Sequence, residues 1–380
     1  MRPVRISWAS VPIPFRTPFA HASATRRTAE NLIVRVEDAD GRVGLGEGCP
    51  RAYVTGETVA SAAGAVARWS RDLLRLDDLE SLRAWLMDRQ AEIAAAPSAV
   101  CAAELALLDL FARQADQPVE DLLGVGERRE PLAVTAIYGD KPAAIFLLQE
   151  ARFRAAGMTV AKMKLSGSPS RDAWRAKRLA RSGPLRLDAN NLWPDAETAL
   201  KGLSALRVPA WAIEEPVQPR DWQGIATVGR ESGLAIVLDE SLGGLEDFDR
   251  LEPGPRYLIN LRLSHAGGLI RTLATMQAAE QRGVEIILGS HVGETSILTR
   301  AGLVAAAAAR SLAGYEGAYG ARLLKYDLVT PSLGFGDDGK LIPERNWRRD
   351  APGWGVALAS SPQRTIAWRT TTTGHTDVNG

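Results

Sequence analysis

Long apolar runs, cysteine and an excess of charge of either sign are all scarce in this chain of 380 residues. No apolar run reaches the ~18 residues that a membrane-spanning helix needs, and the N-terminal segment lacks the apolar core of a secretion signal. Cys49 and Cys101 are the only cysteines, too few for a disulfide framework or a four-thiolate zinc site. These absences lead us to expect a cytoplasmic protein.

Charge and composition exclude further classes of partner. The 46 basic and 45 acidic residues leave a formal net charge of +1, so nothing favours nucleic acid or an anionic membrane. A hydrophobic content of 46% is ordinary for a globular protein. At this length the chain should form two domains, or one barrel with additions.

The first part of the chain changes from strand-like to helix-like sequence. Segments rich in β-branched residues predict three strands, at 5–13, 30–38 and 41–48. Asp40-Gly41 is a hairpin signal before the last of them, and residues 57–115 have helical periodicity. This order predicts an α+β capping domain over residues 1–125.

Beyond residue 130, short apolar runs alternate with stretches of helical length. The runs span 131–138, 158–165, 184–190, 210–216, 234–240, 256–263, 284–290 and 311–317. Strand followed by helix, repeated eight times, predicts an α/β fold of the (β/α)8 TIM-barrel type over residues 126–327. Residues 328–380 are predicted to return to the cap and complete it, with a disordered polar tail from residue 370.

Three acids recur at the ends of consecutive runs. Asp188, Glu214 and Asp239 are 26 and 25 residues apart, which is about one strand–helix unit of a barrel of ~250 residues. Each acid alone could be a solvated loop residue, but acids at the ends of successive barrel strands converge on one point. Three convergent carboxylates indicate a Mg²⁺ site with room for a substrate carboxylate. Asn190, two residues after Asp188, could bind substrate or order its loop.

Two lysines precede the acids on the neighbouring strand. Alternation along a strand puts Lys162 and Lys164 on one face. That face should be the barrel interior, because helices cover the outside. A neighbouring cation lowers a lysine pKa, so one lysine could act as a general base. Lysine and metal together suit removal of the α-proton of a bound carboxylate, with an enediolate stabilised by the metal charge.

These motifs resemble a known family. K-x-K, LDAN, EEP and DES follow one another about 25 residues apart, as in the enolase superfamily, and the muconate cycloisomerase subgroup is the nearest match. The resemblance implies Lys164 as base, Lys162 as its electrostatic neighbour and the three acids as Mg²⁺ ligands. It also matches Glu316 with a glutamate near the proton path, although a salt bridge at the barrel mouth is the alternative role.

Arg262 departs from the pattern of this subgroup. Its members usually carry a lysine at that place on the sixth strand, whereas arginine has a pKa above ~12 and is a poor proton acceptor. Arg262 could bind a carboxylate, or turn away and support the fold. One-base, cycloisomerase-like chemistry is therefore predicted. Dehydration of the o-succinylbenzoate synthase type and dipeptide epimerase or N-acylamino acid racemase activity are alternatives, as is a silent barrel that only binds a ligand.

Further candidates for substrate binding lie in loops. His291 and Glu294 follow the seventh run, where His291 could be an acid–base group or an ordinary hydrogen-bonding residue. A loop from Pro12 to Ala29 carries His21, and a second loop at 49–58 carries Arg51 and Tyr53. Both loops are predicted to close over the barrel mouth. The expected partner is a small-molecule carboxylate, and we expect a homo-oligomer.

Overall fold

A long β-hairpin begins the chain in the computed structural model, which describes residues 1–380 apart from 22–23, 127–129, 343–349, 361–365 and 374–380. Strand β1 (Pro3–His21) pairs with β2 (Ala24–Asp38), which turns at Asp40-Gly41 into β3 (Val43–Gly48). The predicted loop from Pro12 to Ala29 is therefore wrong. Every second residue from Val11 to Phe15 is buried, so the alternation that makes a strand continues through the prolines.

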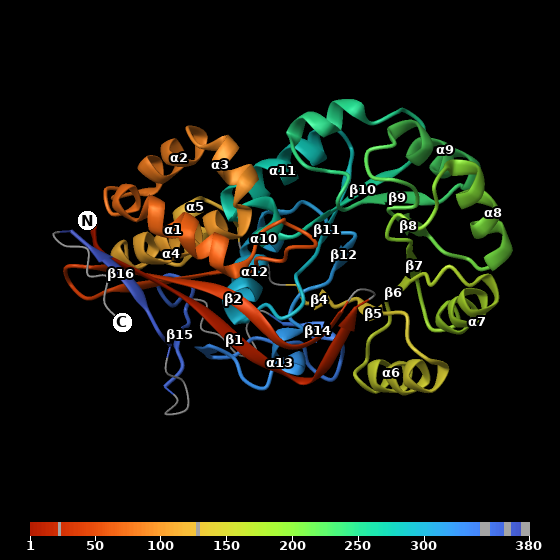
Figure 1. Ribbon diagram of the computed structural model, residues 1–380, viewed down its shortest axis with the longest axis horizontal. Helices are drawn as coiled ribbons and strands as arrows, with labels where there is room; N and C mark the ends of the chain where they lie inside the picture. The colour runs from red at the N-terminus through yellow and green to blue at the C-terminus, as the bar shows by residue number, and fades with distance from the viewer. Residues whose placement is uncertain (22–23, 127–129, 343–349, 361–365, 374–380) are drawn as a thin grey trace.

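Helices cover one face of this cap sheet (Figure 1). They are α1 (Val59–Leu73), α2 (Leu79–Met87), α3 (Gln90–Ala95), α4 (Pro97–Gln114) and α5 (Val119–Leu123). Helix α4 packs directly on β3, where every second residue is glycine; a Cβ at Gly46 would overlap the carbonyl oxygen of Ala102. The predicted α+β cap is confirmed, and its core depends on this close approach of helix and strand.

Eight parallel strands form the second sheet, in chain order from β12 back to β5. They are β5 (Ala136–Tyr138), β6 (Ala161–Lys164), β7 (Leu185–Asp188), β8 (Ala212–Glu214), β9 (Ala235–Leu238), β10 (Tyr257–Leu261), β11 (Glu285–Leu288) and β12 (Gly314–Tyr315). A parallel bridge between Val134 and Tyr315 joins the last strand to the chain before the first. The sheet is thus a closed barrel, and each predicted run contains one of its strands.

Helices surround the barrel, with one irregular connection (Figure 1). The helices are α6 (Ala143–Ala155), α7 (Pro169–Leu179), α8 (Ala196–Leu206), α9 (Trp222–Ser232), α10 (Leu263–Ala266), α11 (Leu269–Gln281), α12 (Ser296–Ala308) and α13 (Gly320–Leu323). Between β9 and β10 the described chain forms only the 3₁₀ helix η1 (Leu245–Arg250). None of the described helices combines the length and apolarity needed to cross a bilayer.

The C-terminal segment returns to the cap. Its short strands are β13 (Val329–Thr330), β14 (Lys340–Leu341), β15 (Ala357–Leu358) and β16 (Arg369–Thr372). β14 pairs with β4 (Leu132–Ala133), and β16 adds to the cap sheet beside β1. The predicted disorder from residue 370 is wrong for Thr370–Thr372, because they pair with β1, and residues 374–380 lie outside the described part. The domain limits at residues 125 and 327 stay predictions.

Candidate active site

The three predicted acids lie at one end of the barrel. Asp188 ends β7 opposite Glu214 of β8, and Glu214 lies opposite Val237 of β9, two residues before Asp239. Because alternate residues of a strand share a face, Asp239 continues the face on which Val237 and Glu214 lie. The structure thus brings the three carboxylates to the same mouth, where all three side chains are nearly buried.

Lys162 lies between these carboxylates. Its Nζ is 3.8 Å from Asp188 Oδ2, 3.2 Å from Glu214 Oε1 and 2.8 Å from Glu316 Oε2. The side chain is buried, so this ammonium group compensates acids that would otherwise repel one another. The structure therefore places Glu316 beside Lys162, in the kind of ion pair at the barrel mouth that was the alternative to a place near the proton path.

Lys164 is the more accessible of the two lysines. Its Nζ lies 3.1 Å from Asp188 Oδ2 and donates a hydrogen bond to Asn190 Oδ1. The Lys164 side chain is 27% exposed and that of Lys162 only 6%. Lys164 can therefore reach a bound molecule, whereas Lys162 is enclosed by carboxylates. Asn190 is placed next to the lysine, and its backbone N–H donates to Asp188 Oδ1.

The sequence reasoning missed two polar residues of the interior. Arg186 is buried and forms ion pairs with Glu214, 3.3 Å away, and with Glu316. Asn260 of β10 donates a hydrogen bond of 3.1 Å to Glu214 Oε1. The sequence did contain a signal for Arg186, because this residue stands two residues before Asp188 and therefore lies on the same face of the strand. A charged residue inside a barrel strand requires a buried partner.

Opposing influences set the protonation of the acids. Burial raises the pKa of Glu214, but the charges of Lys162 and Arg186 outweigh it and hold the pKa at about 2. Burial also raises the pKa of Asp239, and there the opposing charge of Arg262 does not fully compensate. Glu214 is therefore ionised at neutral pH.

Arg262 faces the site and does not turn away. It forms a hydrogen-bonded ion pair with Asp239. Burial lowers its pKa, but Asp239 and the nearby Glu240 outweigh burial and raise the pKa above its usual value. In the order of the eight strands, β10 lies opposite β6, which carries Lys162 and Lys164. A permanent cation thus faces the lysines from the other side.

The donor set suits a divalent cation. Among the described residues no three His, Cys, Asp or Glu side chains already converge closely enough to hold a metal ion. However, the ammonium group of Lys162 contacts Asp188 and Glu214 at once, so a positive charge already occupies the space between two of the predicted ligands. Three carboxylates on consecutive strands are oxygen donors of the kind that Mg²⁺ prefers.

Glu215 holds the loop that carries Asp239. Its carboxylate accepts hydrogen bonds from the backbone N–H of Asp239 at 2.7 Å and of Ser241 at 2.8 Å, and from the Ser241 hydroxyl at 2.6 Å. Burial raises the pKa of Glu215 to about 7. These contacts give Glu215 a structural role, because they fix the backbone that follows β9.

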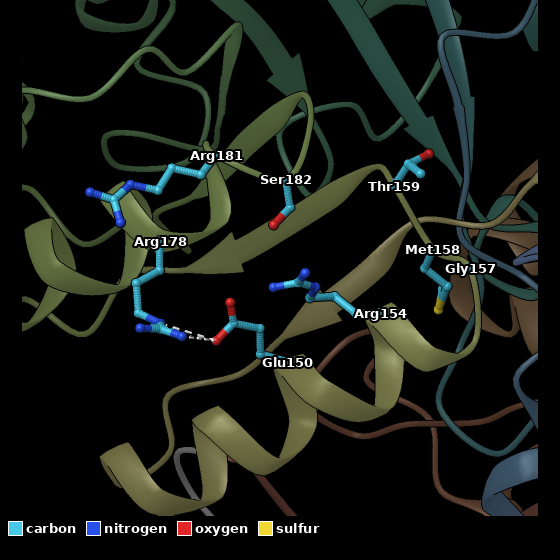
Figure 2. Close-up of a pocket in the computed structure, with 8 residues that line it drawn as sticks. All are labelled: Glu150, Arg154, Gly157, Met158, Thr159, Arg178, Arg181 and Ser182. Carbon is cyan, nitrogen blue, oxygen red and sulfur yellow. Dashed lines mark hydrogen bonds and ion pairs between the residues drawn. The ribbon is translucent and has the colours of Figure 1, made fainter.

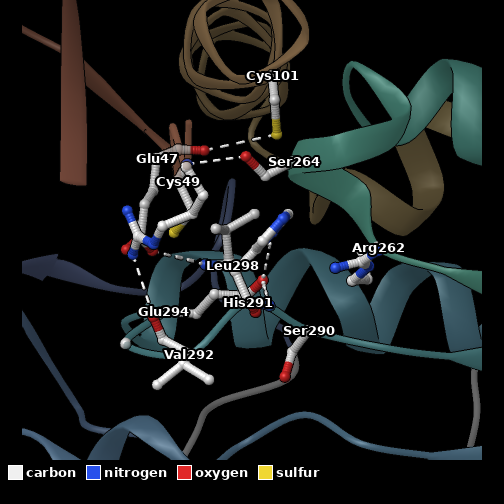
Figure 3. A network of polar contacts seen from close by, with 12 residues as sticks. Glu47, Cys49, Cys101, Arg262, Ser264, Ser290, His291, Val292, Glu294 and Leu298 are labelled. Carbon is white, nitrogen blue, oxygen red and sulfur yellow. Dashed lines mark hydrogen bonds and ion pairs between the residues drawn. The ribbon is translucent and has the colours of Figure 1, made fainter. Parts of the chain in front are cut away.

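A buried polar network joins the cap to the loop after β11 (Figure 3). Glu47 of the cap accepts hydrogen bonds from the backbone N–H and the hydroxyl of Thr295 and from the backbone N–H of Leu298, at the start of α12. Arg51 donates to the carbonyl oxygens of Glu30, Pro50 and Val292 and to Asn31 Oδ1. Because its donors are used in this way, Arg51 ties the domains together and does not offer a free cation to substrate.

The other predicted loop residues are placed less favourably for binding. His291 is buried, and neither ring nitrogen has a hydrogen-bond partner among the described residues. Burial, with Arg262 and Arg51, holds its pKa well below the usual value. Glu294 accepts a hydrogen bond from the His291 backbone N–H, and Tyr53 is 47% exposed. The side chain of His21 lies outside the described residues.

A cavity lies at the end of the barrel where the strands begin, opposite the end that carries the acids and lysines (Figure 2). It measures about 400 Å³ and is lined by Arg154, Arg178 and Arg181 beside the starts of β6 and β7. Glu150 pairs with Arg178 there at 2.8 Å. None of the predicted site residues lines it, so the acids and lysines belong to a separate place at the other end of the strands.

A capped (β/α) barrel with acids and lysines at its mouth is typical of one class of barrel enzymes. Comparison with known families identifies that class. Residues 4–124 match the mandelate racemase/muconate lactonizing enzyme N-terminal domain, and residues 147–361 match the enolase C-terminal domain-like family. The chain belongs to the mandelate racemase/muconate lactonizing enzyme group of the enolase superfamily. It is an enzyme, an isomerase or lyase of that superfamily, and the alternative of a silent barrel is wrong.

Several relatives with assigned activities are epimerases or racemases. The chain is 31% identical to the aromatic dipeptide epimerase of Herpetosiphon aurantiacus, over 76% of this chain and 82% of that protein. It is 26% identical to the N-succinyl-L-Arg/Lys racemase of Bacillus cereus, over 80% and 83%. The structure of a dipeptide epimerase from Methylococcus capsulatus, complexed with Mg and the dipeptide L-Arg-D-Lys, matches with a TM-score of 0.80 and 27% identity, over 94% and 100%. These relatives match the epimerase or racemase alternative and not the cycloisomerase that we favoured from the sequence.

Proposed function

We propose that this enzyme removes the α-proton of a dipeptide or an N-acylated amino acid and returns a proton to the same carbon, as epimerases and racemases do. The observation that carries the proposal is the position of Lys164. Its amine is the accessible lysine at the barrel mouth and lies beside a carboxylate of the acid set. The names of the relatives support the substrate class.

Each charged residue has a part in this reaction. Asp188, Glu214 and Asp239 would hold Mg²⁺, which supplies positive charge to the substrate carboxylate as its α-proton leaves. Lys164, as the neutral amine, accepts the proton at Nζ. Lys162 and Arg186 keep Glu214 ionised, and they hold Glu316 in place. Asn190 orients Lys164 through its hydrogen bond.

One observation favours a second candidate. Inversion at carbon requires proton transfer on both faces, and the group opposite Lys164 is Arg262, which is paired with Asp239. Arginine hardly releases or accepts a proton near neutral pH. One-face chemistry, either lactone formation or elimination, is therefore the second candidate for this site.

Hydrogen exchange in D₂O tests the proposal. Dipeptides and N-acyl amino acids are incubated with the Mg²⁺-loaded enzyme, and loss of the α-proton signal is followed by ¹H NMR with chiral chromatography of the product. We expect exchange, and we expect Lys164→Met to slow it by roughly 100-fold to 10,000-fold, the usual contribution of a general base. Lys201→Met is the matched control, because Lys201 is an exposed helix residue paired with Glu197. Undiminished exchange in Lys164→Met would exclude this residue as the base.

A further inference from the structure

A cavity of about 260 Å³ adjoins the acid site between barrel and cap. Asp239, Arg262, His265 and Arg271 line its barrel side. The other lining residues are mostly apolar or glycine, among them Ile93 of the cap. A pocket for a whole drug-sized ligand measures ~300–1,000 Å³. This smaller space suits one substituent of a molecule whose reacting carbon lies at the neighbouring site.

Two polar side chains of this cavity are not used by the fold. Among the described residues, the guanidinium of Arg271 and the imidazole of His265 have no hydrogen-bond or ion-pair partner, although both residues are half-buried. Burial, with the charges of Arg262 and Arg271, lowers the pKa of His265 to about 4. The imidazole is therefore neutral near pH 7 and has one N–H to donate.

The charge of the lining is unbalanced. Asp239 is the only acid among the described lining residues, and it is already paired with Arg262. Arg271 is left as an uncompensated cation on α11, directly after the short helix that carries His265. A half-buried guanidinium without an acid partner attracts a carboxylate, which it can bind through two parallel hydrogen bonds.

We propose that this cavity is a subsite for a second carboxylate of the substrate, held by Arg271 and His265. The assignment rests on the proposed function, because it places the reacting α-carbon at Lys164 and the acid sites. It narrows the substrate to dicarboxylates whose second carboxylate is separated from the reacting carbon by a short chain. That carboxylate belongs either to the N-acyl group or to the amino-acid side chain, and the apolar wall around Ile93 packs against the intervening methylenes.

Matched pairs of acid and amide test the subsite by direct binding. Calorimetry with the Mg²⁺-loaded enzyme compares N-succinylglycine with its terminal amide, and N-acetylglutamate with N-acetylglutamine. The first pair tests an acyl carboxylate and the second a side-chain carboxylate. We expect the acid of one pair to bind roughly tenfold or more tightly than its amide, since a hydrogen bond to a charged group contributes about 1.5–3 kcal/mol.

Variants assign the preference to the arginine. Arg271→Met should abolish the preference for the acid, because it weakens binding of the acid more than binding of the amide, and Arg271→Lys should retain part of the preference. Arg310→Met is the control, because the Arg310 side chain is 87% exposed and lies before β12, outside this cavity. The proposal is overturned if neither acid is preferred, if none of the four compounds binds, or if the preference survives Arg271→Met.

The two proposals can fail separately. A preference for the acid that depends on Arg271, without α-proton exchange in any compound, supports the subsite and contradicts the proposed reaction. Exchange that proceeds equally well with acid and amide supports the reaction and contradicts the subsite.

Discussion

Arg262 and Asp239 form an ion pair across the ends of β10 and β9, on the side of the barrel opposite the lysines of β6. The resemblance to the enolase superfamily implies a lysine at the arginine position. A guanidinium retains its proton near neutral pH, so this side of the site has charge but no proton acceptor. Under the proposed reaction, inversion needs proton transfer on this side, so Arg262 is the residue whose replacement tests the stereochemistry.

Arg262→Lys should increase inversion. A lysine at this position can exchange a proton with the second face of the reacting carbon, so the ratio of inverted product to deuterium incorporation should rise by roughly tenfold or more. Chiral chromatography and mass spectrometry of the product formed in D₂O give this ratio. Arg262→Met, which has neither charge nor base, is the control and should not show the rise. An unchanged ratio in Arg262→Lys would contradict a role for this position in proton transfer.

Asp239→Asn should weaken Mg²⁺ binding. The variant removes one of three carboxylates while keeping the shape of the side chain, and we expect a loss of roughly tenfold or more in affinity. Titration calorimetry with MgCl₂ measures it. Glu197→Gln is the matched control, because that carboxylate is 79% exposed on α8 and pairs with Lys201. Equal affinities in the two variants would remove Asp239 from the ligand set.

Gly46→Ala should destabilise the cap. A Cβ at Gly46 meets the backbone of α4, which cannot move aside as a flexible side chain can, so we expect a loss of ~1–3 kcal/mol in the free energy of unfolding. Gly64→Ala is the matched control. The nearest atom to a Cβ at Gly64 in α1 is Arg68 Nη1 at 3.8 Å, and alanine there should stabilise by ~0.5–1 kcal/mol. Urea unfolding measures the change in the free energy of unfolding, which should be negative for Gly46→Ala and positive for Gly64→Ala. Equal changes in the two variants would contradict the close packing of β3 on α4.

Glu104→Gln should change how stability depends on pH. Glu104 of α4 accepts hydrogen bonds from the backbone N–H groups of Leu269 and Ile270 at the start of α11, and burial raises its pKa from 4.5 to about 8. Between these values the folded protein holds a proton that the unfolded chain releases. The free energy of unfolding therefore falls as pH rises, by at most ~1.4 kcal/mol per pH unit from this group.

Glutamine keeps the acceptor oxygen and does not titrate. Urea unfolding at about pH 5.5 and about pH 8 should therefore show that the wild type loses more stability than Glu104→Gln. Glu47 and Glu294, whose pKa values burial raises to about 7 and about 8, are present in both proteins and cancel in the comparison. If the free energy of unfolding fell equally in the two proteins between these pH values, Glu104 would be ionised throughout this range.

Much of the fold was predictable because strands and helices have different periods. Each of the eight apolar runs contains a barrel strand, and the Ala- and Leu-rich region after residue 57 contains the cap helices. The hairpin beyond Pro12 was missed because prolines normally end strands, whereas here Ile13 and Phe15 continue the buried face. The 3₁₀ helix η1 has no comparable pattern in the sequence, because a single short turn produces no repeating period.

The sequence by itself determined the order and spacing of the acids and lysines, and with them the end of the barrel at which they meet. Alternation along a strand predicts the face on which a residue lies, but it does not predict which residue lies across the barrel from it. Only the tertiary structure brought Glu316 to Lys162, 154 residues earlier, and paired Arg262 with Asp239. Within the part of the chain that the structure describes, it also left the Arg271 side chain without a partner. Contacts between distant strands follow from barrel closure, which is a property of all eight strands together and is encoded in no single segment.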